Sequence, residues 1–331
     1  MPKIRGVNLG GWLVLEKWMT PELFQGSEAL DEYHLLEEKP DLTWLKRHRD
    51  TFIQESDFAW LNAQGIEYVR LPVGWWLFEA KAPYLAATET FFKALLWADA
   101  HDLKVILDVH AAPGCQNGFD NGGLQGVIDW PKGDNVEKTL AFIETLVEKT
   151  KSWTCVVGIE LLNEPFKTVD LDLIQDFYQR GYEIVRRIKG DAYAIIMHDG
   201  FRLDAWEEFF TQNDFKNVYL DTHMYHTFGE IKPTADFDAF KALYDQRLEA
   251  IQTVQNYVPV IVGEWSNPLL SEQFNTPPHD AQLRKDLFEM QQRIFNQADG
   301  WFFWNYTLSE ESLKTHPGWS YRYLIETHLH G

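Results

Sequence analysis

Short runs of apolar residues recur along the whole chain, and each run is about as long as a β-strand. Eight of them are predicted strands, at Ile4–Leu9, Glu67–Val73, Lys104–His110, Val156–Asn163, Tyr193–Met197, Asn217–His223, Pro259–Glu264 and Gly300–Trp304. Segments with helical periodicity or composition lie between and after these runs, at Asp50–Asn62, Thr90–His101, Asn135–Lys151, Leu171–Ile188, Leu203–Phe210, Asp236–Gln255, Ala281–Gln297 and near Trp319–Leu329. Strands that alternate with helices in this way indicate parallel βα units.

Eight βα units predict an α/β protein of the (β/α)8 TIM-barrel class, for which ~250 residues suffice. The chain has 331 residues, which leaves room for long loops at the rim of the barrel. Neither a linker nor a change in composition divides the chain, so we predict a single domain over residues 1–331. An open, doubly wound sheet is the main alternative. However, no glycine-rich nucleotide-binding pattern follows any predicted strand.

Two of the predicted strands lead into a glutamate. Glu164 follows the fourth strand and precedes Pro165, and Glu264 ends the seventh strand. Barrel enzymes carry catalytic groups at the carboxyl ends of their strands, so both side chains are expected at one rim. Pro165 disfavours helical backbone at Glu164, which we therefore expect to be extended. Such a pair suits cleavage of a glycosidic bond, because one acid protonates the leaving oxygen and one carboxylate meets the positive anomeric carbon.

Other polar and aromatic side chains follow predicted strands at the same rim. With the two glutamates they form one set, which comprises Arg70, His110, Asn163, Glu164, His223, Tyr225, Glu264 and Trp304. A single arginine or histidine at a strand end is more often structural than catalytic. Packing alone does not explain eight such residues on the face where the βα loops gather, so the set predicts an active site.

The composition narrows the range of partners. The formal net charge is −20, which argues against a nucleic acid or an anionic membrane as partner, because either would need a basic patch. No stretch of ~20 apolar residues predicts a membrane-spanning helix. A neutral sugar is compatible with this charge. The two cysteines, Cys115 and Cys155, imply no disulfide framework.

No cofactor or metal is expected. His223 and His226 with Asp221 match no trusted zinc spacing, and a pair of carboxyls can act without a metal. The first residues enter a strand pattern at once, without the apolar segment of a secretion signal. We therefore expect a cytoplasmic protein, with secretion of a processed form left open, and the oligomeric state stays open too.

Taken together, these residues resemble glycoside hydrolase family 5, whose members are retaining (β/α)8 hydrolases. The resemblance implies that Glu164 is the acid/base and Glu264 the nucleophile. It implies supporting roles for the rest of the set. Asn163 would bind the sugar 2-hydroxyl, and Trp304 would form the floor of the sugar subsite. His223 and Tyr225 would adjust the pKa values of the two carboxyls, and Arg70 and His110 would support the nucleophile. It also implies a cis peptide bond between Trp304 and Asn305.

Three segments look like the exo-β-1,3-glucanase branch of that family: Arg5–Glu16, Thr20–Phe24 and His110–Asn121. In that branch the matching residues bind a terminal glucose and clamp the next sugar between two phenylalanines. The substrate-binding set that this implies is Glu16, Trp18, Phe119, Asp120, Asn121, Phe228 and Trp304. The chain departs from the branch at Asn305 and Tyr306, which replace the usual run after the eighth strand. It also lacks the disulfides and the visible secretion signal of familiar fungal members.

We therefore predict a retaining exo-β-1,3-glucanase that releases glucose from the non-reducing end of a β-glucan oligosaccharide or β-glucoside. A β-glucosidase for small glucosides and an endo-acting glucanase are the alternatives within the enzymes. A non-catalytic sugar-binding barrel would require the loss of a catalytic carboxyl. Catalysis requires an ionised Glu264 and a protonated Glu164, so we expect Arg70 to lower the pKa of Glu264 and the neighbouring negative charge to raise that of Glu164.

Overall fold

A computed structural model describes residues 3–232, 236–269 and 281–329 of the chain. Eight parallel strands close into a barrel in the order of the chain, and the first strand pairs with the last. The strands are β1 (Ile4–Asn8), β2 (Tyr68–Gly74), β3 (Lys104–Ala111), β4 (Val156–Glu160), β5 (Ala194–His198), β6 (Val218–His223), β7 (Val260–Trp265) and β8 (Gly300–Phe303). The predicted (β/α)8 fold is confirmed. The predicted domain also includes residues 1–2, 233–235, 270–280 and 330–331, which lie outside the described residues.

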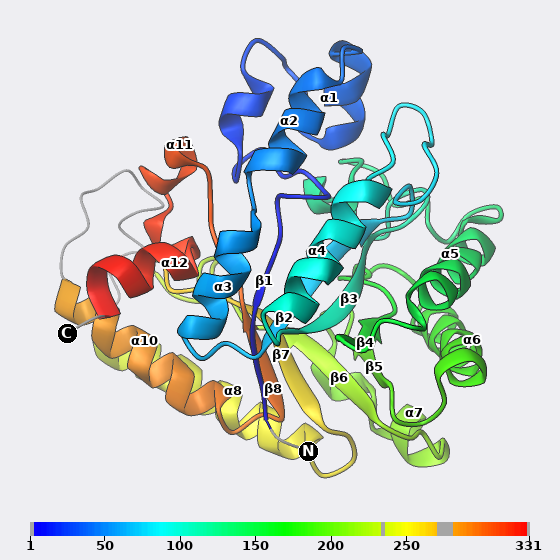
Figure 1. The fold of residues 1–331 in the computed structure, drawn as a ribbon. Coiled ribbons are helices and arrows are strands. Elements are labelled where there is room, and N and C mark those ends of the chain that lie inside the picture. The colour runs from blue at the N-terminus through cyan, green and yellow to red at the C-terminus, as the bar shows by residue number, and fades with distance from the viewer. Residues whose placement is uncertain (1–2, 233–235, 270–280, 330–331) are drawn as a thin grey trace.

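Helices surround the barrel, and α1 and α2 lie beyond the end toward which β1 runs (Figure 1). The α-helices are α1 (Glu32–Glu38), α2 (Thr43–Thr51), α3 (Glu55–Ala63), α4 (Thr88–Ala100), α5 (Asn135–Thr150), α6 (Leu171–Lys189), α7 (Glu207–Gln212), α8 (Phe237–Val254), α10 (Ala281–Phe295), α11 (Glu310–Leu313) and α12 (Tyr321–Leu324). Short helical turns are η1 (Pro21–Phe24), η2 (Asp120–Gly122), η3 (Leu203–Ala205), η4 (Pro317–Trp319) and η5 (Ile325–Leu329).

The strands are buried on both faces, because the helices cover the outside of the barrel and side chains fill its interior. Alternate residues of a strand face inward. One apolar cluster is formed by such residues near the amino-terminal ends of the strands: Ile4, Tyr68, Ile106, Ala194, Ile196, Tyr219, Ile261 and Phe302. Two positions further along the strands stand polar residues, among them Arg70, Asp108, His198 and Asp221. The strand period thus places a charged layer above an apolar one.

Three local predictions are wrong. The predicted helix Asp50–Asn62 is broken, because α2 ends at Thr51 and the Asp57 carboxylate accepts the Gln54 N–H at 2.7 Å, which starts α3 anew. The fourth strand ends at Glu160 instead of Asn163. Glu164 is not extended: its φ is +45°, in the left-handed region that side chains other than glycine rarely adopt.

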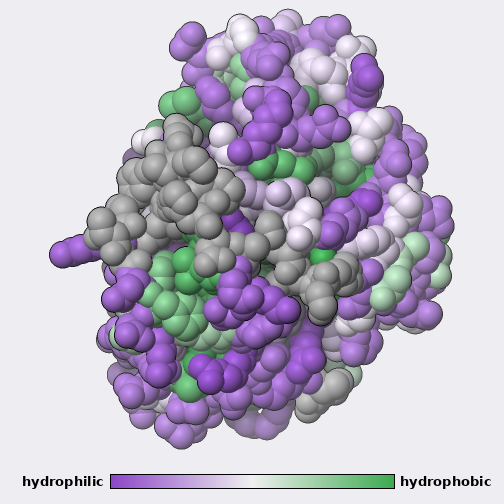
Figure 2. Space-filling view, turned by 90° about the vertical axis from the view of Figure 1, so that its left-hand side faces the viewer, coloured by the Kyte–Doolittle hydropathy of each residue, from purple (hydrophilic) through white to green (hydrophobic). Residues whose placement is uncertain are grey.

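None of the helices in the described segments has both the length and the apolar character needed to cross a membrane. Figure 2 shows one face of the molecule, on which hydrophilic residues predominate and apolar areas are small.

Candidate functional site

Glu264, near the end of β7, is buried and held by two donors. The guanidinium of Arg70 donates through Nη1 to Oε1 at 3.1 Å, and the hydroxyl of Tyr225 donates to Oε2 at 2.6 Å. Hydrogen bonds of this kind favour the charged form of a carboxyl group. The geometry therefore supports Glu264 as a carboxylate with both oxygens oriented.

Arg70 is the centre of a buried network inside the barrel. Its other hydrogen bonds reach β4, the segment after β4 and β1, and go to Glu160 Oε2 at 2.7 Å, Asn163 Oδ1 at 2.7 Å and Asn8 Oδ1 at 2.9 Å. Asp108 Oδ2 lies 3.1 Å from Nη1. Arginine presents its donors in a rigid planar fork, so these contacts fix the direction from which the guanidinium meets Glu264.

Glu164 lies four residues beyond the end of β4, just before Pro165. Its Oε1 is 2.7 Å from His223 Nδ1, and its Oε2 accepts a hydrogen bond from Asn121 Nδ2 at 2.9 Å. The left-handed backbone at this residue is sterically costly for a glutamate, and such conformations persist at sites where the surroundings enforce them. Here the enforced backbone turns the carboxyl toward His223.

His223, at the end of β6, stands between the two carboxyls. Its Nδ1 is 2.7 Å from a Glu164 oxygen and 3.3 Å from a Glu264 oxygen, and its Nε2 is 3.4 Å from Asp221. The two glutamate oxygens are therefore at most about 6 Å apart, close to the ~5–5.5 Å of retaining glycosidases and below the ~6.5–9.5 Å of inverting ones.

The expected order of the two pKa values is wrong for the free site. Burial would raise the pKa of Glu164, but the hydrogen bonds from His223 and Asn121 outweigh it and lower that pKa. Burial raises the pKa of Glu264, and the charge of Glu164 adds to it, although His223 and Arg70 act in the opposite direction. The reason is the placement of His223, whose own pKa is well above its usual value: burial would lower it, but the Glu264 and Asp221 carboxylates prevail.

On the other side of the site, Glu16 follows β1 and is buried. The Trp18 indole donates to its Oε2 at 2.8 Å, while Oε1 has no hydrogen-bond partner within the described chain. Burial and the neighbouring Asp120 raise the pKa of Glu16 well above its usual value. Burial also raises the pKa of Asp120, to about 6. An unpartnered oxygen beside a second carboxyl suits the hydroxyl groups of a ligand.

Trp304 lies directly after β8 and stacks on His110, with ring centroids 5.5 Å apart and planes 6° from parallel. His110 Nδ1 is 2.6 Å from Asp108, which holds the imidazole in this plane. The Trp304–Asn305 peptide is cis, as the family resemblance implies.

Two predicted substrate residues are exposed. Phe119 packs edge-on against Phe166 at 5.5 Å between ring centroids, and Phe228 packs edge-on against Tyr225 at 5.5 Å. Phe228 is 72% exposed and Phe119 38% exposed, which is unusual for large apolar side chains. One phenylalanine thus stands beside the Glu164 loop and the other beside the tyrosine that holds Glu264.

The structure adds residues that the sequence analysis missed. Asp108 and Glu160 hold Arg70 from β3 and β4, and Trp319 packs on both Trp18 and Tyr225. His198 directly follows a predicted strand, so the criterion applied to the other strand ends would have found it. Asp108 alternates with His110 and could have been found from the strand period. Nothing in the sequence around Trp319 points to the site.

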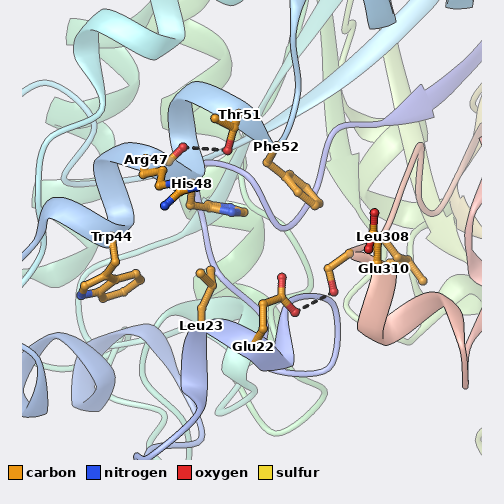
Figure 3. Close-up of a pocket in the computed structure, with 10 residues that line it drawn as sticks. Glu22, Leu23, Trp44, Arg47, His48, Thr51, Phe52, Leu308 and Glu310 are labelled. Carbon is orange, nitrogen blue, oxygen red and sulfur yellow. Dashed lines mark hydrogen bonds between the residues drawn. The ribbon is translucent and has the colours of Figure 1, made fainter.

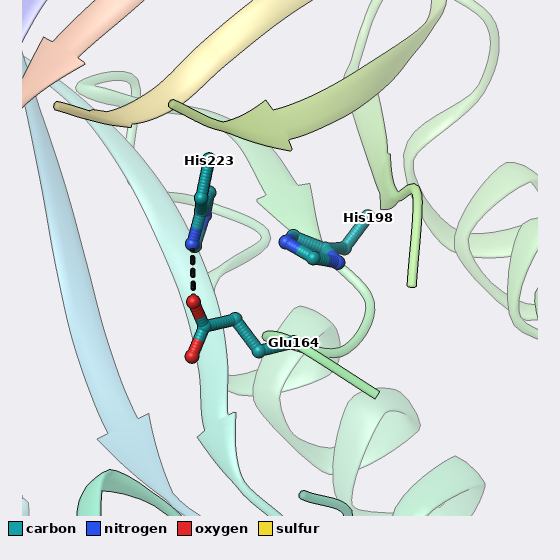
Figure 4. A group of neighbouring side chains, drawn as sticks. All are labelled: Glu164, His198 and His223. Carbon is teal, nitrogen blue, oxygen red and sulfur yellow. Dashed lines mark hydrogen bonds and ion pairs between the residues drawn. The ribbon is translucent and has the colours of Figure 1, made fainter. Parts of the chain in front are cut away.

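Glu164, His198 and His223 also have ligand-type atoms that all lie within 4.8 Å of one another (Figure 4). The same holds for Glu160, Asp221 and His223. His226, weighed above as a metal ligand, uses both ring nitrogens elsewhere. Its Nδ1 is 2.8 Å from the Tyr244 hydroxyl, and its Nε2 is 2.8 Å from the Pro268 carbonyl oxygen. The alternative set of His223, His226 and Asp221 is therefore not arranged around His226.

A hollow of about 500 Å³ lies away from this site, on the outer side of the β1 loop (Figure 3). Its lining includes Trp44, Arg47 and Phe52, and it contains none of the predicted site residues. Ser309 donates to Glu22 there at 2.8 Å, which ties the β1 loop to the loop after β8. We assign this hollow no part in the chemistry.

Comparison with known proteins shows which family has a sequence similar to this chain. Residues 32–309 match the model of the cellulase family, glycosyl hydrolase family 5. The probable glucan 1,3-beta-glucosidase A of Emericella nidulans is 42% identical over 283 residues, which cover 81% of this chain and 68% of that protein. The glucan 1,3-beta-glucosidase of Schwanniomyces occidentalis is 33% identical over 359 residues, covering 92% of this chain and 83% of the relative.

Among solved structures, the rutinosidase from Aspergillus niger has a TM-score of 0.82 at 19% identity and covers 98% of this chain and 97% of its own. This likeness concerns the fold alone. The match of the family model over most of the chain, together with the identity to these relatives, shows that the chain belongs to glycosyl hydrolase family 5.

Proposed function

We propose that the protein is a retaining exo-β-1,3-glucanase, which releases glucose from the non-reducing end of a β-glucan chain. The observation that carries the retaining mechanism is the position of His223, whose one nitrogen lies 2.7 Å from Glu164 and 3.3 Å from Glu264. The relatives named glucan 1,3-beta-glucosidase support the choice of linkage.

In the first half-reaction, a Glu264 oxygen attacks the anomeric carbon and the bond to the leaving oxygen breaks. Glu164 gives its proton to that oxygen, so the shortened glucan leaves as an alcohol and a covalent glycosyl-enzyme remains. In the second half-reaction, water attacks the same carbon, Glu164 takes a proton from it, and Glu264 is released as a carboxylate. Two inversions give net retention.

Glu164 must hold a proton when the substrate is attacked. In the free site the shared proton lies on His223, because the surrounding carboxylates raise the pKa of its imidazole and the imidazole lowers that of Glu164. Transfer across the 2.7 Å contact moves this proton to Glu164. It also removes the positive charge beside Glu264, and Arg70 and Tyr225 remain to hold that carboxylate.

The buried Glu16 and the adjacent Asp120 support action at a chain end. Their carboxyl oxygens can accept hydrogen bonds from the hydroxyls of one glucose, and a site with buried acceptors discriminates against ligands that leave them unpaired. Asn121 contacts Glu164 itself, so we assign it to the acid as much as to the sugar. We assign the exposed Phe119 and Phe228 to contact with the following sugar.

Digestion of laminarin tests this proposal, with cello-oligosaccharides and an aryl β-glucoside as controls for linkage and for small glucosides. Glucose is expected from the first minutes while the polymer shortens slowly. An early ladder of mid-sized fragments would show an endo-acting enzyme. Cleavage of the aryl glucoside alone would instead identify a β-glucosidase for small substrates.

A further inference from the structure

His198, the last residue of β5, is fully buried beside the catalytic pair. The Gly200 N–H donates to its Nδ1 at 3.0 Å, so in the neutral ring the hydrogen must be carried by Nε2. Asp199, the other polar neighbour of Nδ1, is 3.5 Å away and accepts the Phe201 N–H instead. Burial, together with the positive charges of His223 and Arg70, lowers the pKa of His198 well below its usual value, so the ring stays neutral.

The Nε2 edge of His198 points toward the face of the His223 ring (Figure 4). The two ring centroids are 4.4 Å apart and the planes meet at 81°. Nε2 has no hydrogen-bond partner within the described chain. The face of a neutral aromatic ring is negative and attracts an N–H, whereas a positively charged ring repels it. This contact therefore opposes a positive charge on His223.

The carboxyl groups around His223 act in the opposite sense. The carboxyl groups of Glu164, Glu264 and Asp221 face it from the segment after β4, from β7 and from β6, and they favour its protonated form. Arg70, from β2, carries a positive charge that disfavours it. His198 is the neutral group that β5 adds to this environment.

We propose that His198 is a positioning residue that shifts the proton shared by Glu164 and His223 toward Glu164, the arrangement in which Glu164 can act as an acid. No bond other than the Glu164–His223 proton contact changes, and no further reactant is needed. The inference deepens the proposed function and rests on it.

Loss of the His198 N–H leaves more of the proton on His223. The rate of glycosidic cleavage at intermediate pH then falls, since only molecules with protonated Glu164 can donate. The same change makes the pair hold its proton to higher pH, so the alkaline limb of the pH profile moves upward. The two effects are linked: a tenfold fall in the rate at intermediate pH accompanies a shift of the alkaline limb by about one pH unit. At the highest pH the profiles of variant and wild type coincide, because the acidity of Glu164 beside a neutral His223 is unchanged.

The test compares wild type, His198→Phe and Tyr178→Phe by kcat/KM across pH. His198→Phe keeps an aromatic ring without the N–H, and His198→Met replaces it if that variant does not fold. Tyr178→Phe is the matched control, because among the described residues its hydroxyl bonds to the backbone carbonyl of His198 alone, at 2.9 Å. Laminaribiose requires a general acid, whereas 2,4-dinitrophenyl β-glucoside carries a leaving group that does not.

His198→Phe should lose about tenfold on laminaribiose, within the ~10²–10⁴-fold that general acids supply, with the linked alkaline shift. It should match wild type on the dinitrophenyl substrate, and Tyr178→Phe should match wild type on both. Equal losses on both substrates, or a loss without the alkaline shift, would overturn the proposal. Wild-type enzyme that cleaves the dinitrophenyl glucoside but not laminaribiose would instead contradict the proposed substrate, and the comparison would then use whichever β-linked disaccharide is cleaved.

Discussion

At the scale of single residues, the two catalytic glutamates differ in their contacts. Glu264 receives hydrogen bonds from Arg70 and Tyr225, which fit a carboxylate that stays charged until it attacks. Glu164 contacts His223, a group that can both give and take a proton. The difference in partners, more than the burial that both share, separates the nucleophile from the acid.

Replacing each glutamate by alanine should therefore have different consequences. Glu264→Ala should abolish turnover of every glucoside, because no nucleophile remains. Glu164→Ala should lose ~10²–10⁴-fold on glucans but far less on a dinitrophenyl glucoside, which needs no acid. Azide added to Glu164→Ala should yield the β-glycosyl azide, identified by NMR. The α-azide would show that the roles are assigned wrongly.

The Trp304 indole packs so closely on Gly10 that this position has no room for a side chain. A Cβ atom at Gly10 would lie 2.5 Å from Cη2 of the Trp304 ring, so Gly10→Ala must displace that indole. We expect lower kcat/KM on all glucosides, small ones included, because the floor of the first sugar site moves. Steady-state kinetics measure this, with near-UV circular dichroism to check the fold. Unchanged kinetics would show that Trp304 does not contact the sugar.

At the scale of elements, the short helix α1 supports the β1 loop through a buried carboxyl. Glu32 accepts the Leu15 N–H at 2.9 Å, and Arg49 lies 3.9 Å away. Burial raises the pKa of Glu32 to about 7, although Arg49 and the Leu15 N–H act against it. The folded protein thus binds a proton there that the unfolded chain has lost by neutral pH.

The free energy of unfolding should accordingly depend on pH through Glu32. Because the folded pKa is the higher one, the stabilising effect is complete below the unfolded value of 4.5 and is lost as pH rises through about 7. Thermal unfolding of wild type and Glu32→Gln from pH 5 to pH 8 should show wild type losing roughly 2–3 kcal/mol relative to the variant. Parallel curves would contradict a raised pKa at Glu32.

The elements were largely predictable, and their ends were not. Runs such as Val260–Val262 and the helical periodicity of α5 and α6 are strong signals, because burial on one or both faces imposes them. The break between α2 and α3 depends on one side-chain cap at Asp57, and Glu164, with its left-handed backbone, is held by contacts from Asn121 in η2 and His223 in β6. Periodicity carries neither kind of information.

The site was predictable to a similar degree. Residues at strand ends are brought together by any closed barrel, so Glu164, Glu264 and His223 could be grouped from the sequence. The pKa order could not, since it depends on which carboxyl His223 approaches more closely. The same holds for His198, whose effect depends on the angle between two rings.

At the scale of the whole molecule, barrel closure makes the active site. Arg70 on β2 meets Glu160 on β4, and Asn8 on β1 meets the carbonyl oxygens of Gly263 and Phe303 on β7 and β8. Segments from both ends of the chain also meet at the rim, where Trp18 packs on Trp319.

Metal independence is a further prediction at this scale. The proposed chemistry uses only two carboxyls and the groups that hold them, so prolonged dialysis against a chelator should leave laminarin hydrolysis unchanged. Metal content measured before and after dialysis is the control. Complete loss of activity that one added metal restores would refute the prediction.

The central claim is that Glu264 forms the covalent glycosyl-enzyme. The most direct measurement is mass spectrometry of the enzyme after reaction with 2-deoxy-2-fluoro-β-glucosyl fluoride, which slows release of the intermediate. One fluoroglucosyl group should appear on the peptide that contains Glu264, and fragmentation should place it on that side chain. A label on Glu164 instead, or turnover of the reagent with inversion at the anomeric carbon and no labelled enzyme, would contradict the account.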